Sequence, residues 1–295
     1  MYLEKISTFL PMYSNMNKSD FITMIQGLGK SPGLAYKYEK DFILTLILIR
    51  FSEVFPDLVF KWGTCLNKVY FPYFRLSEDL DFVRENKDDL GRTGRKSLLK
   101  QYENTMISEL LKLGLTLQDE RTKFDEYRLA MFSFAYESAL DSSMQTIKID
   151  ISLKSQLQLP PVRLPIRAIF QDVILGEDIF SEHTLTCIDL TEALAEKMRA
   201  ALTRREPAIR DFFDIWYART LWGFDFSDPV FRDLLSGKLR EVDYAYTLEE
   251  NHDLLMRQIK TDLRSVLTDD YGFDFDSIYT FVLSYKTSLA ILDLS

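Results

Sequence analysis

The sequence predicts an α+β protein in which a mixed β-sheet flanked by helices is followed by a C-terminal helical bundle. Two observations support this fold class. Between residues 58 and 190, short runs with alternating apolar and polar side chains recur, as half-buried strands require, and a longer helical segment separates some of them. After residue 190 only the helical spacing of apolar residues remains. We therefore expect two domains, comprising residues 1–189 and 190–295.

The start of the chain is expected to be helical up to the first strand. Residues 36–55 carry a dense apolar stretch flanked by charged residues, which is typical of a helix buried on most sides. Pro56 ends this helix, and residues 58–62 form a short β-rich run. Gly63 and Thr64 then mark a turn that leads into a short helix.

The central part of the chain combines predicted strands with one long helix, residues 88–114. A polar turn at residues 141–143 separates two alternating segments, which indicates a hairpin. The strands predicted here are residues 80–83, 127–138, 144–153, 165–170 and 184–190.

The last third of the chain is predicted to be helical throughout. Residues 191–205 form one helix, and Pro207 starts a second, because proline suits the first turn of a helix. Two or three further helices are expected over residues 229–294.

The composition is that of a globular protein without a general attraction for nucleic acid. The chain has 295 residues, 46% of them hydrophobic, and a net charge of −9. Because this charge repels phosphates, binding of nucleic acid would require a local basic patch. Residues 92–100 and 197–210 are the two candidates, although a solvated helix face explains the first equally well.

Export, membrane insertion and zinc binding have no support in the sequence. The start of the chain lacks the basic and apolar regions of a secretory signal. The most apolar run, residues 42–49, is far shorter than the roughly 20 residues of a membrane span. Two cysteines and two histidines are too few for a disulfide framework or a set of zinc ligands. We therefore expect a cytoplasmic location and no membrane partner.

Three aspartates occupy the polar faces of two predicted strands. Because side chains alternate along a strand, Asp79 and Asp81 share one face, and Leu80 and Phe82 share the other. Asp150 lies on the polar face of a second strand whose opposite face is apolar. If the two strands are neighbours, the three carboxylates converge. Such a cluster repels itself unless a divalent cation neutralises it, and carboxylate ligands favour Mg²⁺ or Mn²⁺.

Gly63 and Thr64 precede these aspartates and are suited to binding a phosphate. Glycine allows close approach of the backbone, the following helix begins with unpaired N–H groups, and the Thr64 hydroxyl is a donor. Together with a metal, this order predicts metal-assisted phosphoryl chemistry. Paired aspartates and Gly-Thr turns are each common in ordinary structures, so the hypothesis depends on their order and spacing.

A second group of candidate residues lies in the helices after residue 190. Lys197 and Arg204 share a helix face with small residues, and Asp211 follows on the next helix beside Arg210. In the functional interpretation, Lys197 and Arg204 contact a triphosphate, and Asp211 orients a cation or accepts a proton. Ordinary ion pairs in a helical hairpin, such as Arg210 with Asp214, are the alternative.

These stretches resemble the AbiEii/AbiGii toxin family of nucleotidyltransferases, in the DNA polymerase β-like superfamily. That family has a Gly-Gly-Thr-x-Leu-x-Lys-Val-Tyr segment running into Arg-x-Ser-Glu-Asp-x-Asp, and this chain has WGTCLNKVY and then RLSEDLDF. The family also has Glu-Lys-x-Arg-Ala followed by Arg-Asp-x-x-Asp, and this chain has EKMRA and RDFFD. Two departures are Trp62 in place of the first glycine and FPYF between the first two segments. The resemblance covers about a fifth of the chain.

The resemblance implies a nucleotidyltransferase domain and a helical domain with the nucleotide between them. It implies transfer of a nucleoside monophosphate from an NTP to an RNA (tRNA) or protein acceptor, with Mg²⁺ or Mn²⁺ held by Asp79, Asp81 and Asp150. Family members are toxins, so a cognate antitoxin is an expected partner. The expected catalytic residues are Asp79, Asp81, Asp150 and Asp211, and the expected nucleotide-binding residues are Gly63, Thr64, Lys68, Ser77, Lys197, Arg204 and Arg210.

Two other functional classes remain open at this point. A nucleotide-binding or partner-binding protein of the same fold that has lost catalysis is suggested by Trp62 and by the acidic composition. A glycosyltransferase also uses a paired-aspartate metal site, but the Gly-Thr turn and the RDFFD helix argue against it.

Overall fold

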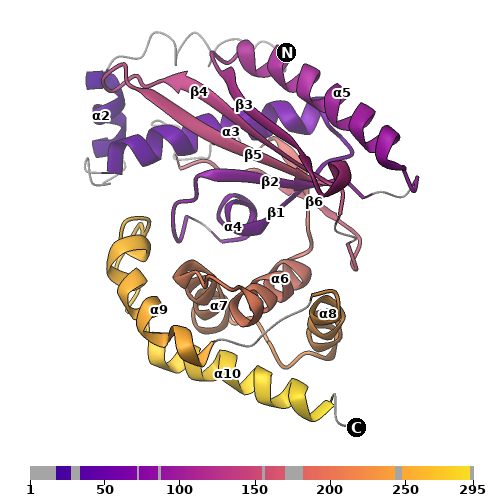
Figure 1. Ribbon diagram of the computed structural model, residues 1–295. Helices are drawn as coiled ribbons and strands as arrows, with labels where there is room; N and C mark the ends of the chain where they lie inside the picture. The colour runs from indigo at the N-terminus through magenta and orange to yellow at the C-terminus, as the bar shows by residue number, and fades with distance from the viewer. Residues whose placement is uncertain are drawn as a thin grey trace. The chain divides into compact units, whose positions relative to one another are not determined.

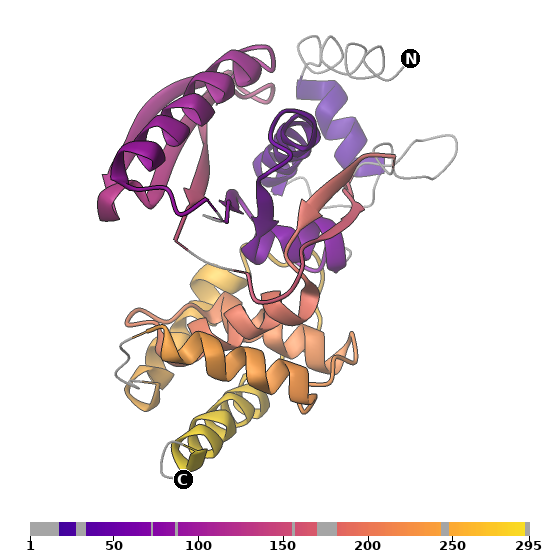
Figure 2. The same ribbon diagram turned by 90° about the vertical axis from the view of Figure 1, so that its right-hand side faces the viewer.

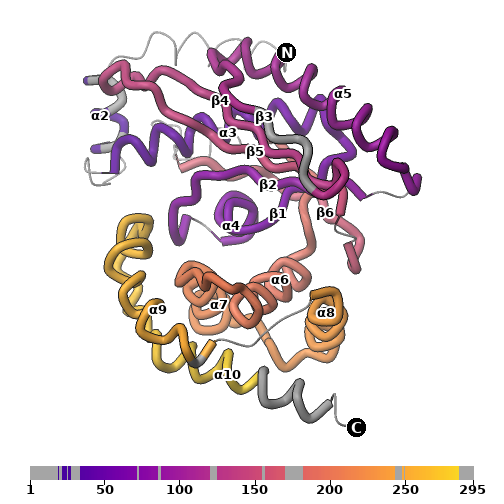
Figure 3. Tube along the Cα trace, viewed as in Figure 1, coloured from indigo at the N-terminus to yellow at the C-terminus, as the bar shows by residue number. Residues whose placement is uncertain are grey.

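The computed structural model confirms the expected α+β class. It describes residues 18–27, 34–71, 73–85, 88–154, 157–169, 182–242 and 248–292 (Figure 3, where the remaining residues are grey). The helical structure expected before residue 18 lies outside the described residues.

The described strands form one mixed seven-stranded sheet in the order β3-β4-β5-β2-β1-β7-β6 (Figure 1). Their bounds are β1 (Val59–Lys61), β2 (Asp79–Val83), β3 (Thr116–Phe124), β4 (Leu129–Glu137), β5 (Met144–Ser152), β6 (Val162–Pro165) and β7 (Thr184–Cys187). The pairs β2–β5 and β1–β7 are parallel, and the other neighbouring strands are antiparallel. The two strands that carry the aspartates are therefore direct neighbours in the middle of the sheet.

The described helices lie before, between and after the strands. Those in the first part of the chain are α2 (Lys18–Gly27), α3 (Ala35–Val54), α4 (Trp62–Cys65), the π-helical η2 (Leu66–Tyr70), α5 (Arg92–Leu111) and the single turn η3 (Asp125–Tyr127). Those after the sheet are α6 (Leu190–Thr203), α7 (Ile209–Thr220), α8 (Pro229–Arg240), η4 (Glu249–Asn251), α9 (His252–Gln258), η5 (Ile259–Leu263) and α10 (Phe275–Leu292).

The apolar face of the sheet is covered by α3 and α5. The rings of Phe51 on α3 and Phe82 on β2 lie 5.3 Å apart, and Phe55 and Tyr102 join the two helices at 5.5 Å. Figure 2 shows α5, coloured magenta, along the strands of similar colour. The apolar side chains of β2 and β5 thus lie on the covered face. The polar side chains that alternate with them, including the aspartates, lie on the opposite face.

Several elements differ from the sequence-based predictions. Strand β3 was not predicted, because its residues TLQDERTKF are mostly polar. The strand expected at residues 165–170 lies at Val162–Pro165, and the proline is its last paired residue. The long helix starts only at Arg92, and the short helix already begins at Trp62, before the Gly-Thr pair.

The helical second part of the chain is organised around α6. The carboxylate of Asp189 caps this helix by accepting a hydrogen bond from the Thr191 amide, and Asp228 caps α8 in the same way ahead of Pro229. Helix α6 packs against α7, α8 and α10. The second helix of this part begins at Ile209 rather than at Pro207.

Two compact units emerge from the contacts within the chain. The first comprises Met1–Gln156 and Pro161–Cys187, and the second comprises Leu157–Pro160 and Ile188–Ser295. The short segment Leu157–Pro160 belongs to the second unit because the buried Glu192 carboxylate accepts hydrogen bonds from the amides of Gln158 and Leu159. Within the described residues, no helix has both the length and the hydrophobicity needed to cross a membrane.

Candidate active site

The register between β2 and β5 brings the predicted aspartates onto one face of the sheet. Asp81 is the direct neighbour of Asp150 across the parallel pair, and Asp79 lies opposite Lys148. Since partners in register point to the same side of a sheet, the three carboxylates share the face opposite the core. Strand β1 adds Lys61, which lies opposite Asp81.

Asp150 has a strongly perturbed environment. Burial, and then the negative charge of Asp79, raises the pKa of Asp150 from 3.8 to about 6, while Lys148 and Lys61 oppose the rise. Its Oδ1 atom is buried and has no hydrogen-bond partner among the described residues. A buried carboxylate oxygen without a partner is costly, so this atom is prepared to receive a cation or a proton.

The donor set suits a hard divalent cation, but the side chains do not enclose one. Carboxylate oxygens on one face are the ligands that Mg²⁺ and Mn²⁺ prefer. In the part of the chain that the structure describes, however, no group of three Asp, Glu, His or Cys side chains converges closely enough to hold a metal ion. The strands place the three carboxylates on one face of the sheet, and metal coordination would require their side chains to turn toward one another.

The Gly-Thr turn is fastened to the start of β2 by hydrogen bonds. The Thr64 hydroxyl donates to the carbonyl oxygen of Asp79 and lies 2.7 Å from the Ser77 hydroxyl. Because Thr64 has a single hydroxyl proton and a carbonyl can only accept, Ser77 must donate to Thr64. The structure thus brings Gly63, Thr64 and Ser77 next to the first aspartate, with the two hydroxyls fixing the turn.

Trp62, the departure from the family motif, has a left-handed backbone. Its φ is 65°, in the region that glycine adopts freely and that other L-residues rarely enter. The turn therefore has a conformation that suits glycine, although a large side chain occupies the position. The Lys61 ammonium lies 5.3 Å from the centroid of the Trp62 ring.

Lys68 does not face the carboxylates. Its side chain is fully buried, and its ammonium lies 2.7 Å from Asp41 Oδ2, 2.6 Å from the Thr45 hydroxyl and 3.0 Å from the Tyr73 hydroxyl. Its role as a nucleotide-binding residue stays a prediction. Lys68 instead ties η2 to α3 through a buried ion pair.

The second unit contains a buried charge cluster. The Lys197 ammonium lies 2.8 Å from an Asp211 oxygen and 2.9 Å from an Asp214 oxygen, and Arg204 forms an ion pair with Asp211 at 2.9 Å. Lys197, Asp211 and Asp214 are buried, whereas Arg204 and Arg210 are exposed. These pairs join α6 to α7, rather than forming along one helix as the simple alternative predicted.

Two side chains at the carboxylate face, Lys61 and Lys148, were not among the site residues predicted from the sequence. Both moderate the pKa of Asp150. Lys148 stands two residues before Asp150 and could have been found from the alternation of β5 alone. Lys61 is placed by the pairing of β1 with β2, which the local sequence does not reveal.

Comparisons with known proteins find similarity over most of the chain. The sequence matches the family model described as "Nucleotidyl transferase AbiEii toxin, Type IV TA system" over residues 46–286. Two solved structures from Helicobacter pylori are similar. The structure of JHP933 has a TM-score of 0.49 and 16% identity, covering 88% of this chain and 97% of the other. That of a candidate nucleotidyltransferase has a TM-score of 0.48 and 16% identity, covering 89% and 98%. No curated protein matches the sequence.

Proposed function

Because the chain belongs to the AbiEii family of nucleotidyl transferase toxins, we propose that it transfers a nucleoside monophosphate from an NTP to a hydroxyl group of an RNA, such as tRNA, or of a protein. The family places the protein in a type IV toxin–antitoxin system, which implies an NTP substrate and an antitoxin partner. We further propose that it acts in the cytoplasm, where NTPs and tRNA are available.

The pairing of Asp81 with Asp150 in adjacent parallel strands is the observation that supports this proposal most strongly. In the transfer, the acceptor oxygen bonds to the α-phosphorus of the NTP, and the bond from that phosphorus to the pyrophosphate oxygen breaks. When bound, Mg²⁺ or Mn²⁺ would neutralise the negative charge of the carboxylates and phosphates. Asp79 and Asp81 would hold it, and Asp150 would be a ligand or take the acceptor proton, for which its raised pKa is suitable.

The roles proposed for the second unit follow the observed pairs. Arg204 and Arg210 are exposed and would contact the triphosphate, and Arg204, which is paired with the Asp211 carboxylate, would exchange this partner for a phosphate. Lys197 is held between Asp211 and Asp214, so its proposed role toward the nucleotide is indirect: it positions Asp211.

The test is transfer of label from each of the four NTPs, with Mg²⁺ or Mn²⁺, to total RNA or to protein. Asp81→Asn is expected to abolish labelling because it removes a ligand charge while preserving the shape of the side chain. Asp233→Asn, at an exposed position on α8, is the matched control and should label at the wild-type rate. Absence of any labelled acceptor, or labelling that Asp81→Asn leaves unchanged, would contradict the proposal.

A nucleotide-binding protein without transfer is the second candidate, and Trp62 is the observation that favours it. A large side chain now occupies the turn where the family has glycine, and its backbone stays left-handed. Calorimetry would then show metal-dependent NTP binding, and a coupled assay would show no release of pyrophosphate. Release of pyrophosphate at a rate that Asp81→Asn lowers would eliminate this candidate.

A further inference from the structure

The exposed face of α5 forms a polar and basic groove that the proposed active site does not use. Burial recurs on the opposite side of the helix at Leu99, Tyr102, Met106 and Leu110, which fixes the orientation of α5 on the sheet. An open hollow of about 580 Å³ follows the outward side. Its described lining residues, which we call the α5 groove, are Thr93, Lys96, Ser97, Lys100, Gln101, Asn104 and Thr105.

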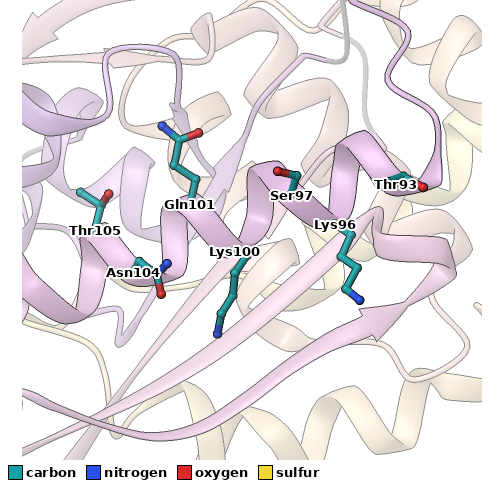
Figure 4. A pocket seen from close by; sticks show the side chains of 7 residues that line it. All are labelled: Thr93, Lys96, Ser97, Lys100, Gln101, Asn104 and Thr105. Atoms are coloured by element: carbon teal, nitrogen blue, oxygen red, sulfur yellow. The ribbon is translucent and has the colours of Figure 1, made fainter.

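The side chains of the α5 groove form two rows. Figure 4 shows Lys96 and Lys100 one turn apart on the same side of the helix, and Ser97, Gln101 and Thr105 on the other. Residues four apart lie above one another on a helix, so each row runs along the axis. Between Thr93 and Thr105 the groove is about 18 Å long, at the ~1.5 Å rise per residue of a helix.

An aromatic ring lies beside the basic end of the groove. The Arg92 guanidinium carbon and the Lys96 ammonium each lie 5.9 Å from the ring centroid of Tyr127. This ring is carried by η3, where three successive residues have positive φ. The buried Arg95 holds the turn against α5, because its Nε donates to the Glu126 carbonyl and its Nη1 to the Leu90 carbonyl.

We infer that the α5 groove binds a single-stranded RNA segment through its phosphates and that Tyr127 stacks on one base. The inference rests on the proposed function in one respect, since it identifies the acceptor as an RNA. In a chain with a net charge of −9, Arg92, Lys96 and Lys100 provide a local positive surface. Hydroxyl and amide side chains beside cations are the groups that contact phosphate and sugar in nucleic-acid complexes.

The lining chemistry favours RNA over a protein partner. Stable protein interfaces have an apolar centre with aromatic or aliphatic anchors, and the described lining residues contain none. Aromatic rings next to cations are instead typical platforms for unpaired bases. Carboxylates moderate the charge: Lys100 lies 2.6 Å from the largely buried Glu103, and the exposed Glu126, next to Tyr127, lies 3.6 Å from Arg95.

The first experiment measures binding of a fluorescent oligouridylate by anisotropy at several salt concentrations. Lys96→Gln combined with Lys100→Gln should weaken binding about 10- to 30-fold near 0.1 M salt, because each phosphate contact adds about 0.7 to the salt slope for single strands. The slope should become shallower by about 1.4. The matched control is Lys112→Gln combined with Lys260→Gln, two exposed lysines outside the groove, which should bind as wild type.

A second variant separates stacking from charge. Tyr127→Leu should weaken binding about fivefold or more without changing the salt slope, because stacking on a base is not an ionic contact. Thermal melting confirms that each variant is folded. Wild-type affinity or an unchanged slope in the double lysine variant would overturn the inference. Binding of polyglutamate at the groove in preference to the oligonucleotide would also overturn it.

The two proposals can fail separately. If wild-type protein labels an acceptor in an Asp81-dependent way but the groove variants bind and label RNA normally, the groove inference fails and the transferase function stands. If the groove variants lose RNA binding while no labelling is ever seen, the transferase function fails and the binding surface stands.

Discussion

At the scale of single residues, Trp62 is a position near the candidate site where the side chain and the backbone conformation disagree. A non-glycine residue with a left-handed backbone costs roughly 1–2 kcal/mol, and such strain is tolerated where the surrounding structure requires the conformation. The hydrogen bonds of Thr64 to Asp79 and Ser77 provide that requirement. The turn thus holds its left-handed conformation against the preference of its own side chain.

Replacement of Trp62 by glycine and by alanine tests this strain. Both variants lose the indole, but only glycine removes the conflict with positive φ. Trp62→Gly should therefore be more stable than Trp62→Ala by about 1 kcal/mol, the reverse of the usual order at helical positions. Urea unfolding of the two variants measures the difference. Equal stability, or the usual order, would show that Trp62 is not strained.

Asp150 should contribute to stability in a pH-dependent way. Its pKa is raised to about 6 in the folded protein, so between about pH 4 and 6 the folded state binds more protons than the unfolded state. Stability therefore falls as the pH rises through this window, and the charged carboxylate is a cost at neutral pH. Asp150→Asn should stabilise the metal-free protein at about pH 7.5, by about 1 kcal/mol after allowance for partial exposure.

The gain from Asp150→Asn should nearly vanish below about pH 4, where the carboxyl is protonated in both the folded and the unfolded protein. Chemical denaturation at both pH values, in the presence of a chelator, measures it. Asp233→Asn on the surface should show no such pH dependence. A gain of equal size at both pH values would contradict the raised pKa.

At the scale of elements, the alternation along β2 and β5 was sufficient to predict both strands and the faces of their aspartates. The pairing itself could not be predicted, because α5, β3 and β4 lie between these strands in the sequence and parallel partners have no local turn that sets their register. For β3 even the alternation is weak, since polar residues dominate it. The ion pair of Lys68 could not be predicted from the sequence either, because its partner Asp41 is a single charged residue beside a long apolar run.

The ion pair between Lys68 and Asp41 should be important for stability. Lys68→Met leaves the Asp41 carboxylate buried without its partner, which typically costs about 3–5 kcal/mol. Adding Asp41→Leu removes the orphaned charge and should recover most of the loss. Urea unfolding measures both, with Lys112→Met at an exposed position as the control, expected within about 0.5 kcal/mol of wild type. If Lys68→Met lowers stability only slightly but greatly weakens NTP binding, Lys68 contacts the nucleotide instead.

At the scale of the whole molecule, the chain passes between its two compact units more than once. Residues Leu157–Pro160 belong to the second unit, whereas Pro161–Cys187 return to the first. The division expected from the sequence, at residue 189, could not include this excursion, because it depends on Glu192, a residue more than thirty positions away. The hydrogen bonds of Glu192 and its ion pair with Lys238 at 2.7 Å stabilise it.

Glu192 should determine how strongly the amides of Leu157–Pro160 are protected from hydrogen exchange. Glu192→Gln removes the charge that the Gln158 and Leu159 amides bond to, so hydrogen exchange at these two amides should accelerate. Glu196→Gln is the matched control, because Glu196 also pairs with Lys238, at 2.8 Å, but has no bond to either amide. Equal exchange in both variants would indicate that other contacts hold the segment.

The three passages between the units mean that neither unit is one continuous length of chain. A fragment ending at residue 189 would retain Leu157–Pro160 without the carboxylate that binds it, and the complementary fragment would leave Glu192 and Lys238 without the two peptide groups that complete their network. Proteolytic nicking at any single passage would leave the pieces held together until they were denatured. The two units are therefore expected to fold and to unfold together.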